Sequence, residues 1–132
     1  MAKYTSLNID DKGIATLTLN RPEVHNAFDD VMISELLQAL KDVEDSEQAR
    51  VLVLRSEGKN FSAGADLNWM RSMADKNYQQ NVEDAGELGL LMERLDLLSK
   101  PSIALVQGAA FGGAVGLAAC CDIVLAQPRS SF

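Results

Sequence analysis

The order of apolar and polar residues at the start of the chain predicts a β-hairpin. Residues 4–10 and 14–19 alternate between apolar and polar side chains, on either side of the turn sequence DDKG at residues 10–13. Pro22 follows shortly afterwards and ends the second strand, because proline cannot donate to a strand ladder. The chain therefore opens with two antiparallel strands and a loop.

Two longer stretches carry apolar residues at helical spacing. The first is expected to begin at a capping aspartate, Asp29 or Asp30, and to run to about Glu44. The second covers residues 82–98 and follows a polar segment of mixed pattern, residues 71–81. The apolar faces consist of Ile33, Leu36, Leu37, Leu40 and Val43 in the first helix, and of Val82, Ala85, Leu88, Leu91, Met92, Leu95 and Leu98 in the second.

A strand, a turn of small residues and a helix follow one another twice. The first unit is the apolar strand of residues 51–55, then FSAGADL at residues 61–67, then the start of a helix. The second is the apolar strand of residues 103–107, then GAAFGGAVG at residues 108–116, with a helix expected over 114–121. This repetition predicts an α/β fold.

Small residues at such turns suit a ligand that lies against the backbone. The first N–H groups of a helix have no partner within the helix and lie at the positive end of its dipole. Two of them converging on a carbonyl oxygen would stabilise negative charge on it during a reaction, as an oxyanion hole does. The alternative is that each turn only needs small residues to be tight.

Composition and charge exclude several classes of partner. The chain has 132 residues, of which 47% are hydrophobic and 23% are charged, as in one modest globular domain. A net charge of −7 argues against a nucleic-acid or anionic-membrane surface. No apolar run reaches the roughly 18 residues of a membrane span, and residues 1–5 lack the apolar core of a signal peptide.

The cysteines and the histidine indicate a reducing compartment and no metal site. Cys120 and Cys121 are adjacent in an apolar helical run, where we expect buried thiols, and a cytoplasmic location follows. A zinc site needs more Cys or His ligands than a chain with one histidine offers.

Three motifs together resemble those of one enzyme family. NRPEVHNA at residues 20–27, FSAGADL at residues 61–67 and GAAFGG at residues 108–113 resemble, in order and spacing, the N-terminal signatures of the enoyl-CoA hydratase/isomerase (crotonase) superfamily. The resemblance implies a crotonase-like spiral of repeated β-β-α units. The sequence of residues 61–70, together with FGGAVGL at residues 111–117, looks most like the branched-chain group that hydrates methylglutaconyl-type CoA esters.

The resemblance also implies the site. The oxyanion donors would be the backbone N–H groups of Ala65 and Gly113, and Asn26 would hold the first loop by side-chain hydrogen bonds. No cofactor or metal is expected, because coenzyme A is part of the acyl-CoA thioester substrate. Residues expected to contact the substrate or its CoA portion are Val24, His25, Ala27, Ala63, Ala65, Asp66, Leu67, Gly112 and Gly113.

Other roles are open for several of these side chains. An N-cap is the favoured physical role of Asp66, and His25 suits a surface position better than base catalysis. Trp69, Met70 and Met73 suit either an acyl pocket or the core equally well.

The usual acids of the family's hydratases are absent. Gly116 stands where the first glutamate is expected, and the second would lie beyond Phe132. Two rivals to a hydratase stay open: an enoyl-CoA isomerase that needs only one base, and a non-catalytic acyl-CoA-binding or oligomerisation module.

The resemblance further implies a longer parent protein. Residues 1–132 are expected to be the N-terminal spiral core of a crotonase-fold domain, ending with a strand at residues 122–126 and lacking the C-terminal helical part. This portion alone is expected to be inactive. The full-length protein is expected to be a homo-oligomer, either a trimer or a hexamer.

Overall fold

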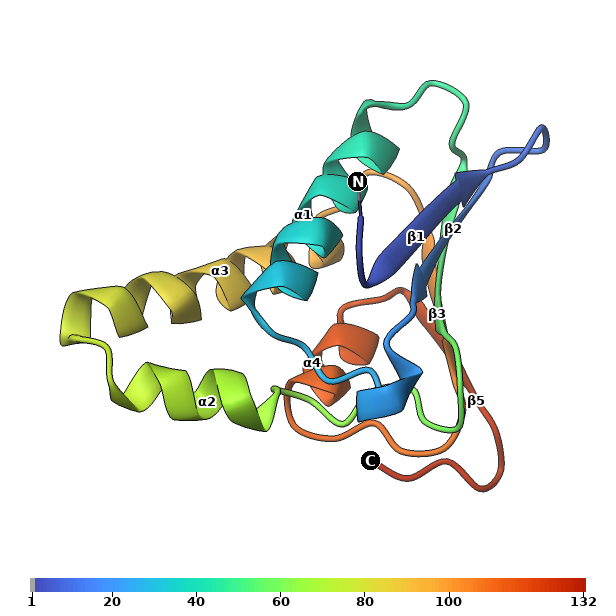
Figure 1. The fold of residues 1–132 in the computed structure, drawn as a ribbon. Helices are drawn as coiled ribbons and strands as arrows, with labels where there is room; N and C mark the ends of the chain where they lie inside the picture. Colours follow the sequence, from blue (N-terminus) through green and yellow to red (C-terminus); the bar gives the residue numbers. More distant parts are fainter. Residues whose placement is uncertain (1) are drawn as a thin grey trace.

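A single five-stranded sheet forms one layer of the fold in this computed structural model, which describes residues 2–132 (Figure 1). The strands lie in sequence order; the first pair is antiparallel and the others are parallel. All five strands were predicted, each to within two residues at either end. They are β1 (Thr5–Ile9), β2 (Ile14–Leu19), β3 (Val51–Ser56), β4 (Ser102–Val106) and β5 (Ile123–Ala126).

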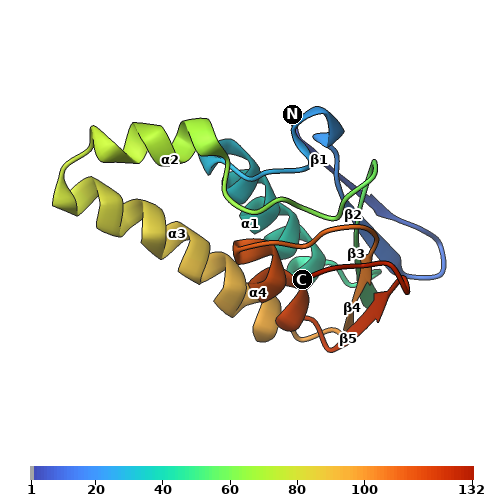
Figure 2. The ribbon, with the colours of Figure 1, turned by 90° about the horizontal axis from the view of Figure 1, so that it is seen from below.

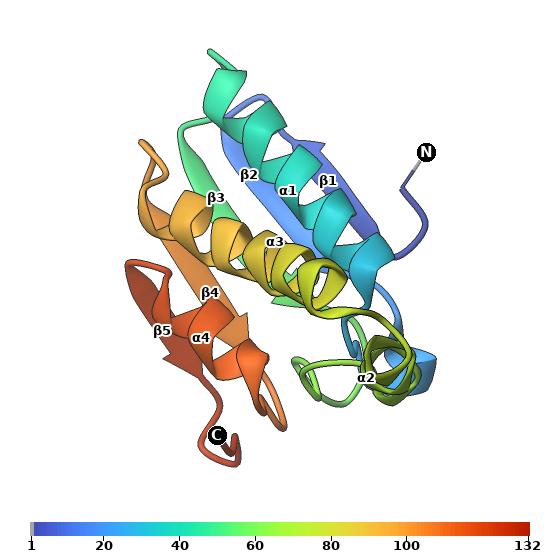
Figure 3. The ribbon, with the colours of Figure 1, turned by 90° about the vertical axis from the view of Figure 1, so that its left-hand side faces the viewer.

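The helices form the second layer on one face of this sheet. Figure 3 shows α1, α3 and α4 in front of the strands, and Figure 2 shows α2 and the first half of α3 projecting away from the sheet as a hairpin. The mixed α/β class is thus as predicted. The helices are the 3₁₀ turn η1 (Pro22–Val24), α1 (Asp30–Asp45), α2 (Leu67–Ala74), α3 (Tyr78–Asp96) and α4 (Gly113–Ala119).

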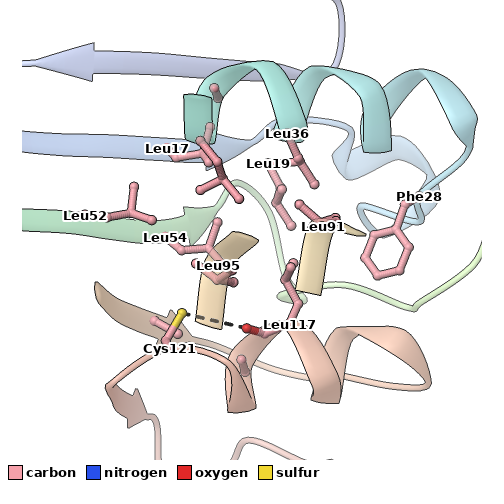
Figure 4. Close-up of a cluster of buried hydrophobic side chains, with 14 of the residues drawn as sticks. Leu17, Leu19, Phe28, Leu36, Leu52, Leu54, Leu91, Leu95, Leu117 and Cys121 are labelled. Atoms are coloured by element: carbon pink, nitrogen blue, oxygen red, sulfur yellow. Dashed lines mark hydrogen bonds between the residues drawn. The ribbon is translucent and has the colours of Figure 1, made fainter. Parts of the chain in front are cut away.

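The core lies between the two layers. Alternate residues of β2 and β3 face the helices, where they meet leucines of α1, α3 and α4 (Figure 4). The predicted apolar face of α1 is buried as a whole, and the Asp29 carboxylate caps this helix by accepting the Met32 N–H at 2.9 Å. The labelled core residues are Leu17, Leu19, Phe28, Leu36, Leu52, Leu54, Leu91, Leu95, Leu117 and Cys121.

Helix α3 differs from its prediction in its start and in its burial. It begins four residues early, at Tyr78, because Asn77 and Gln80 form a capping box at its N-terminus. Of the predicted apolar stripe only Leu91 and Leu95 are fully buried, and Val82 is 46% exposed. The reason is that only the second half of α3 packs on the sheet layer, as Figure 2 shows.

One prediction of burial near the end of the chain is corrected. Cys121 is buried as expected, but Cys120 is only half-buried. All four residues of β5, the edge strand that pairs with β4 alone, are exposed. Within residues 2–132, no helix is both long enough and apolar enough to cross a membrane.

Candidate functional site

The two small-residue turns lie side by side, although 46 residues separate Gly64 from Ala110 in the numbering. Ser62 forms a parallel bridge with Ala110, in which its N–H donates to the Ala109 carbonyl at 3.2 Å. Its own carbonyl accepts the Phe111 N–H at 3.1 Å. The strands β3 and β4 are parallel neighbours, so their following turns emerge at the same edge of the sheet.

Close packing of the two turns depends on Gly64. This residue has φ +90°, and a Cβ there would lie 2.6 Å from the Phe111 carbonyl oxygen and 3.5 Å from the Gly112 Cα. Any other residue would therefore force the two turns apart.

Ala65 and Gly113 each present a backbone N–H without an intramolecular acceptor in the part of the chain that the structure describes. Three of the four adjacent N–H groups are bonded, whereas the Gly112 N–H also has no acceptor among the described residues. Gly64 donates to Ser62 Oγ at 3.1 Å, Asp66 donates to the Phe28 carbonyl at 2.7 Å, and Ala114 donates to the Phe111 carbonyl at 3.1 Å. Both residues are half-buried. A free N–H in each adjoining turn is what a ligand oxygen requires.

Phe28 lies against both turns and fixes their separation. Its N–H donates to the Gly64 carbonyl at 2.8 Å, and its carbonyl accepts the Asp66 N–H. Its ring is packed so closely on Gly113 that a Cβ there would lie 3.1 Å from Cε2. Phe28 itself is 1% exposed and belongs to the core. The positions of both free N–H groups are thus set by a rigid part of the fold.

The carboxylate of Asp66 is fully engaged within the protein. Oδ1 accepts the Trp69 N–H at 3.0 Å and so caps α2, as predicted. Oδ2 accepts from Arg21 Nη1 at 3.0 Å, in an ion pair that is largely shielded from solvent. A contact of Asp66 with CoA stays a prediction, and its carboxylate already has structural partners.

Arg21 is a residue whose role the sequence analysis missed. Its guanidinium donates to the Ala27 carbonyl at 3.1 Å, lies 3.6 Å from Asp29 and stacks 4.4 Å from the centroid of the Tyr4 ring. It thereby connects the loop of residues 22–27 to the caps of α1 and α2. The Asn-Arg-Pro signature itself was the available signal.

The loop of residues 22–27 reaches the first small-residue turn. The His25 carbonyl accepts the Ala63 N–H at 2.9 Å. Val24, His25 and Ala63 are exposed, whereas Ala27 is 7% exposed. Leu67 lies at the start of α2 and is 65% exposed. The predicted contact residues therefore surround one region, except that the side chain of Ala27 faces the protein.

Asn26 holds this loop, as predicted, and is fully buried. Its Oδ1 accepts the Arg21 N–H at 2.7 Å, while Nδ2 donates to the carbonyls of Glu57 at 2.7 Å and Asn60 at 3.0 Å. Its φ of +54° is one that asparagine tolerates better than most residues.

Replacing Asn26 by alanine is expected to lower the free energy of unfolding by about 3 kcal/mol, since three backbone groups lose a part-buried hydrogen bond. Urea unfolding measures this change. Asn68→Ala, at an exposed position of α2, is the matched control and should stay within about 0.5 kcal/mol. Equal effects of the two substitutions would refute the anchoring role of Asn26.

Neither position 116 nor Asp122 supplies an acid at the two turns. Gly116 is half-buried, and a Cβ there would lie 3.4 Å from Met92 Cε of α3. Asp122 accepts from the Ser102 N–H at 2.9 Å, away from the turns at the other end of β4. No cluster of three or more His, Cys, Asp or Glu side chains suited to a metal occurs within residues 2–132.

The three candidate acyl-pocket side chains of α2 differ in how exposed they are. Trp69 is 8% exposed and belongs to the core, although its Nε1 has no acceptor among the described residues. Met73 also packs against the core, whereas Met70 is 44% exposed. Of the three, Met70 is thus the side chain that is open to a ligand.

The two thiols have the properties of packed rather than nucleophilic cysteines. Burial raises the pKa of Cys121 from its ordinary 9.0 to about 11, and burial also raises the pKa of Cys120.

The Cys121 thiol stays protonated in the folded protein up to about pH 11, whereas in the unfolded chain it ionises near 9.0. Its contribution to stability is therefore complete below pH 9 and is lost as pH rises toward 11. We expect the free energy of unfolding to fall over this window more steeply in the native protein than in Cys121→Ala. Denaturant unfolding at pH 8.5 and about pH 10.5 compares the two, and parallel falls would contradict the assignment.

The sequence profile of the family described as enoyl-CoA hydratase/isomerase matches residues 10–132. The chain belongs to the enoyl-CoA hydratase/isomerase family. This match confirms the resemblance inferred from the three motifs. The members of the family are enzymes.

Named relatives and a solved structure of this family are similar to most of the chain. 1,2-Epoxyphenylacetyl-CoA isomerase of Escherichia coli is 39% identical over 133 residues, covering 92% of this chain and 47% of the relative. Enoyl-CoA hydratase domain-containing protein 2, mitochondrial, of Mus musculus is 38% identical over 117 residues, covering 88% and 38%. The crystal structure of an enoyl-CoA hydratase from Shewanella pealeana has a TM-score of 0.97 at 53% identity, covering 99% of this chain and 49% of that one.

These matches confirm the crotonase-type fold and show that the relatives are longer than this chain. The chain spans about half the length of the Escherichia coli and Shewanella pealeana proteins. Their names include both a hydratase and an isomerase, so the similarity fixes the family and leaves the reaction within it open.

Proposed function

We propose that the full-length protein of this enoyl-CoA hydratase/isomerase family member adds water reversibly across the double bond of an α,β-unsaturated acyl-CoA thioester. The observation that carries the proposal is the pair of free N–H groups, Ala65 and Gly113, in two turns that pack directly on each other. The thioester oxygen would accept from both, and no cofactor is required.

The chemistry of the thioester explains why two such donors matter. Its carbonyl oxygen gains negative charge when water attacks the conjugated double bond and an enolate forms. Donors already held in place by the fold stabilise that charge without having to reorganise. Here Phe28 and Gly64 hold the two donors in place, since both residues are buried. Phe28 contacts both turns, and Gly64 of the first turn lies against the second. Residues 22–27 would lie along the CoA portion.

An enoyl-CoA isomerase is the second candidate, and Gly116 favours it. The usual first glutamate is missing there, and the structure puts Met92 next to this position. Moving a double bond needs an enolate and one base, whereas hydration also needs groups that orient water. The Escherichia coli relative is named a 1,2-epoxyphenylacetyl-CoA isomerase, so an isomerase of a CoA ester occurs among the relatives.

Substrate, assembly and location are proposed on the resemblance. We assign a branched, methylglutaconyl-like acyl group and a trimer or hexamer, with residues 1–132 as the N-terminal spiral core. The exposed apolar side chains of β5, Ile123, Val124 and Leu125, support burial of this edge in the complete protein. The two free thiols fit a cytoplasmic location.

Turnover of crotonyl-CoA and of 3-methylglutaconyl-CoA by the full-length protein tests the proposal. Loss of the conjugated thioester absorbance with formation of a 3-hydroxyacyl-CoA product is expected. If the protein instead shifts the double bond of a 3-enoyl-CoA and adds no water, the isomerase proposal would take the place of the hydratase proposal. If the protein binds the esters but catalyses neither reaction, it would be a non-catalytic acyl-CoA-binding module.

A further inference from the structure

Asn60 connects the loop of residues 22–27 with the turn that leads to Gly113. Its Oδ1 accepts the Ala109 N–H at 2.9 Å, and its Nδ2 lies 3.1 Å from Nδ1 of His25. Its backbone carbonyl accepts from Asn26 Nδ2 at 3.0 Å. One half-buried side chain therefore contacts both parts of the proposed site.

The bond to Ala109 fixes which way the Asn60 amide faces. A backbone N–H is only a donor, so the amide atom opposite it must be the oxygen. The site is built for this contact, because Gly108 has φ +60° and a Cβ there would lie 2.6 Å from Asn60 Oδ1. The NH₂ group of Asn60 is consequently the part that faces His25.

This orientation also fixes the tautomer of His25. Because Asn60 Nδ2 is a donor, Nδ1 of His25 must accept, and the proton of the neutral imidazole must reside on Nε2. The backbone of His25 is held as well, since its φ is +54° and its carbonyl accepts the Ala63 N–H. The imidazole is thus an exposed donor with a defined orientation.

We propose that Asn60 is a positioning residue that presents the Nε2–H of His25 to a hydrogen-bond acceptor on the CoA portion of the substrate, while its Oδ1 steadies the turn carrying the Gly113 N–H. This inference rests on the proposed acyl-CoA function. It separates two effects of one side chain: the NH₂ group acts on binding through His25, and the oxygen acts on the reaction through Ala109.

Asn60→Asp and Asn60→Ala distinguish these effects in the full-length protein. The aspartate keeps an acceptor for Ala109 but cannot donate to His25, so KM for the acyl-CoA should rise about tenfold while kcat stays within about twofold. The alanine removes both contacts and should lower kcat as well, by about tenfold. Asn8→Asp, which places the same new charge at an exposed position of β1, should change neither constant.

A double-mutant cycle with His25→Ala separates positioning from simple charge repulsion of the CoA phosphates. If Asn60 acts through His25, the effect of Asn60→Asp on KM disappears in the His25→Ala background. An effect of the same size in both backgrounds would overturn the inference. Thermal unfolding of each variant verifies that it is folded.

The imidazole tautomer gives a readout that does not depend on turnover. Nitrogen-15 NMR of histidine-labelled protein at about pH 8.5, where ordinary imidazoles are neutral, should show the His25 proton on Nε2 and its shift toward Nδ1 in Asn60→Asp. A proton on Nδ1 in the native protein would overturn the positioning role. The Nε2 tautomer in a protein that neither binds nor turns over acyl-CoA would overturn the proposed function and the CoA assignment with it.

Discussion

Proline in place of Gly113 is expected to lower kcat of the full-length enzyme by on the order of 10²–10³-fold, with a much smaller change in KM. Proline has no N–H, so one of the two proposed oxyanion donors is removed, which costs about 3–4 kcal/mol of transition-state stabilisation. The substitution suits the backbone otherwise, because Gly113 is the first residue of α4 and proline is well tolerated at that helical position. Steady-state kinetics with an α,β-unsaturated acyl-CoA measure the loss.

Gly113→Ala is the matched control for this variant. Alanine adds the same Cβ, 3.1 Å from the Phe28 ring, although the proline ring also adds Cγ and Cδ. Only alanine retains the N–H, and its kcat should stay within about tenfold of the native value. Comparable turnover by the proline and alanine variants would exclude Gly113 as a donor, provided that their thermal unfolding midpoints agree.

The sheet and α1 were predictable because their signals are local and strong. Strict alternation around the turn at residues 10–13 specifies the hairpin, and an unbroken apolar face after Asp29 specifies α1. Helix α4 begins at Gly113, one residue before its predicted start. The period of the side chains specifies the hairpin, and period and capping chemistry together specify α1.

The sequence was less informative where an element only partly packs. The pattern of α3 gave no sign that Val82 lies outside the core, because periodicity shows that a face is apolar but not what covers it. Likewise the apolar composition of β5 predicted a strand correctly, but it did not show that the side chains of this edge strand are exposed.

The candidate site, too, was predictable where the signal is local and not where it depends on contacts between distant segments. The two small-residue turns and the loop after Pro22 could be recognised from their residues. The resemblance implied that the turns converge, but the contacts that join them could not be foreseen, because the bridge between Ser62 and Ala110 and the side chain of Asn60 connect segments about 50 residues apart. Asn60 carries no pattern of its own in the sequence, and its importance is apparent only from its partners.

Gly64→Ala is expected to lower the free energy of unfolding by about 2–4 kcal/mol. The new Cβ would meet the Phe111 carbonyl oxygen at 2.6 Å, and an alanine at φ +90° is strained wherever its side chain points. The backbone carbonyl cannot yield as a flexible side chain would, because Phe111 is itself bonded to Ser62. Denaturant unfolding measures the loss, and the slope with denaturant shows whether the unfolded state has changed.

Gly86→Ala makes this prediction specific to the contact between the turns. Gly86 lies in α3, and a Cβ added there would have no atom within 4 Å among the described residues, so alanine should stabilise the protein by about 0.5–1 kcal/mol through helix propensity. Both substitutions reduce the entropy of the unfolded chain equally, so their difference reports the native state alone. Opposite signs are therefore expected. A stabilising Gly64→Ala would mean that the turns are not in contact in solution, and the two free N–H groups could then not act on one oxygen.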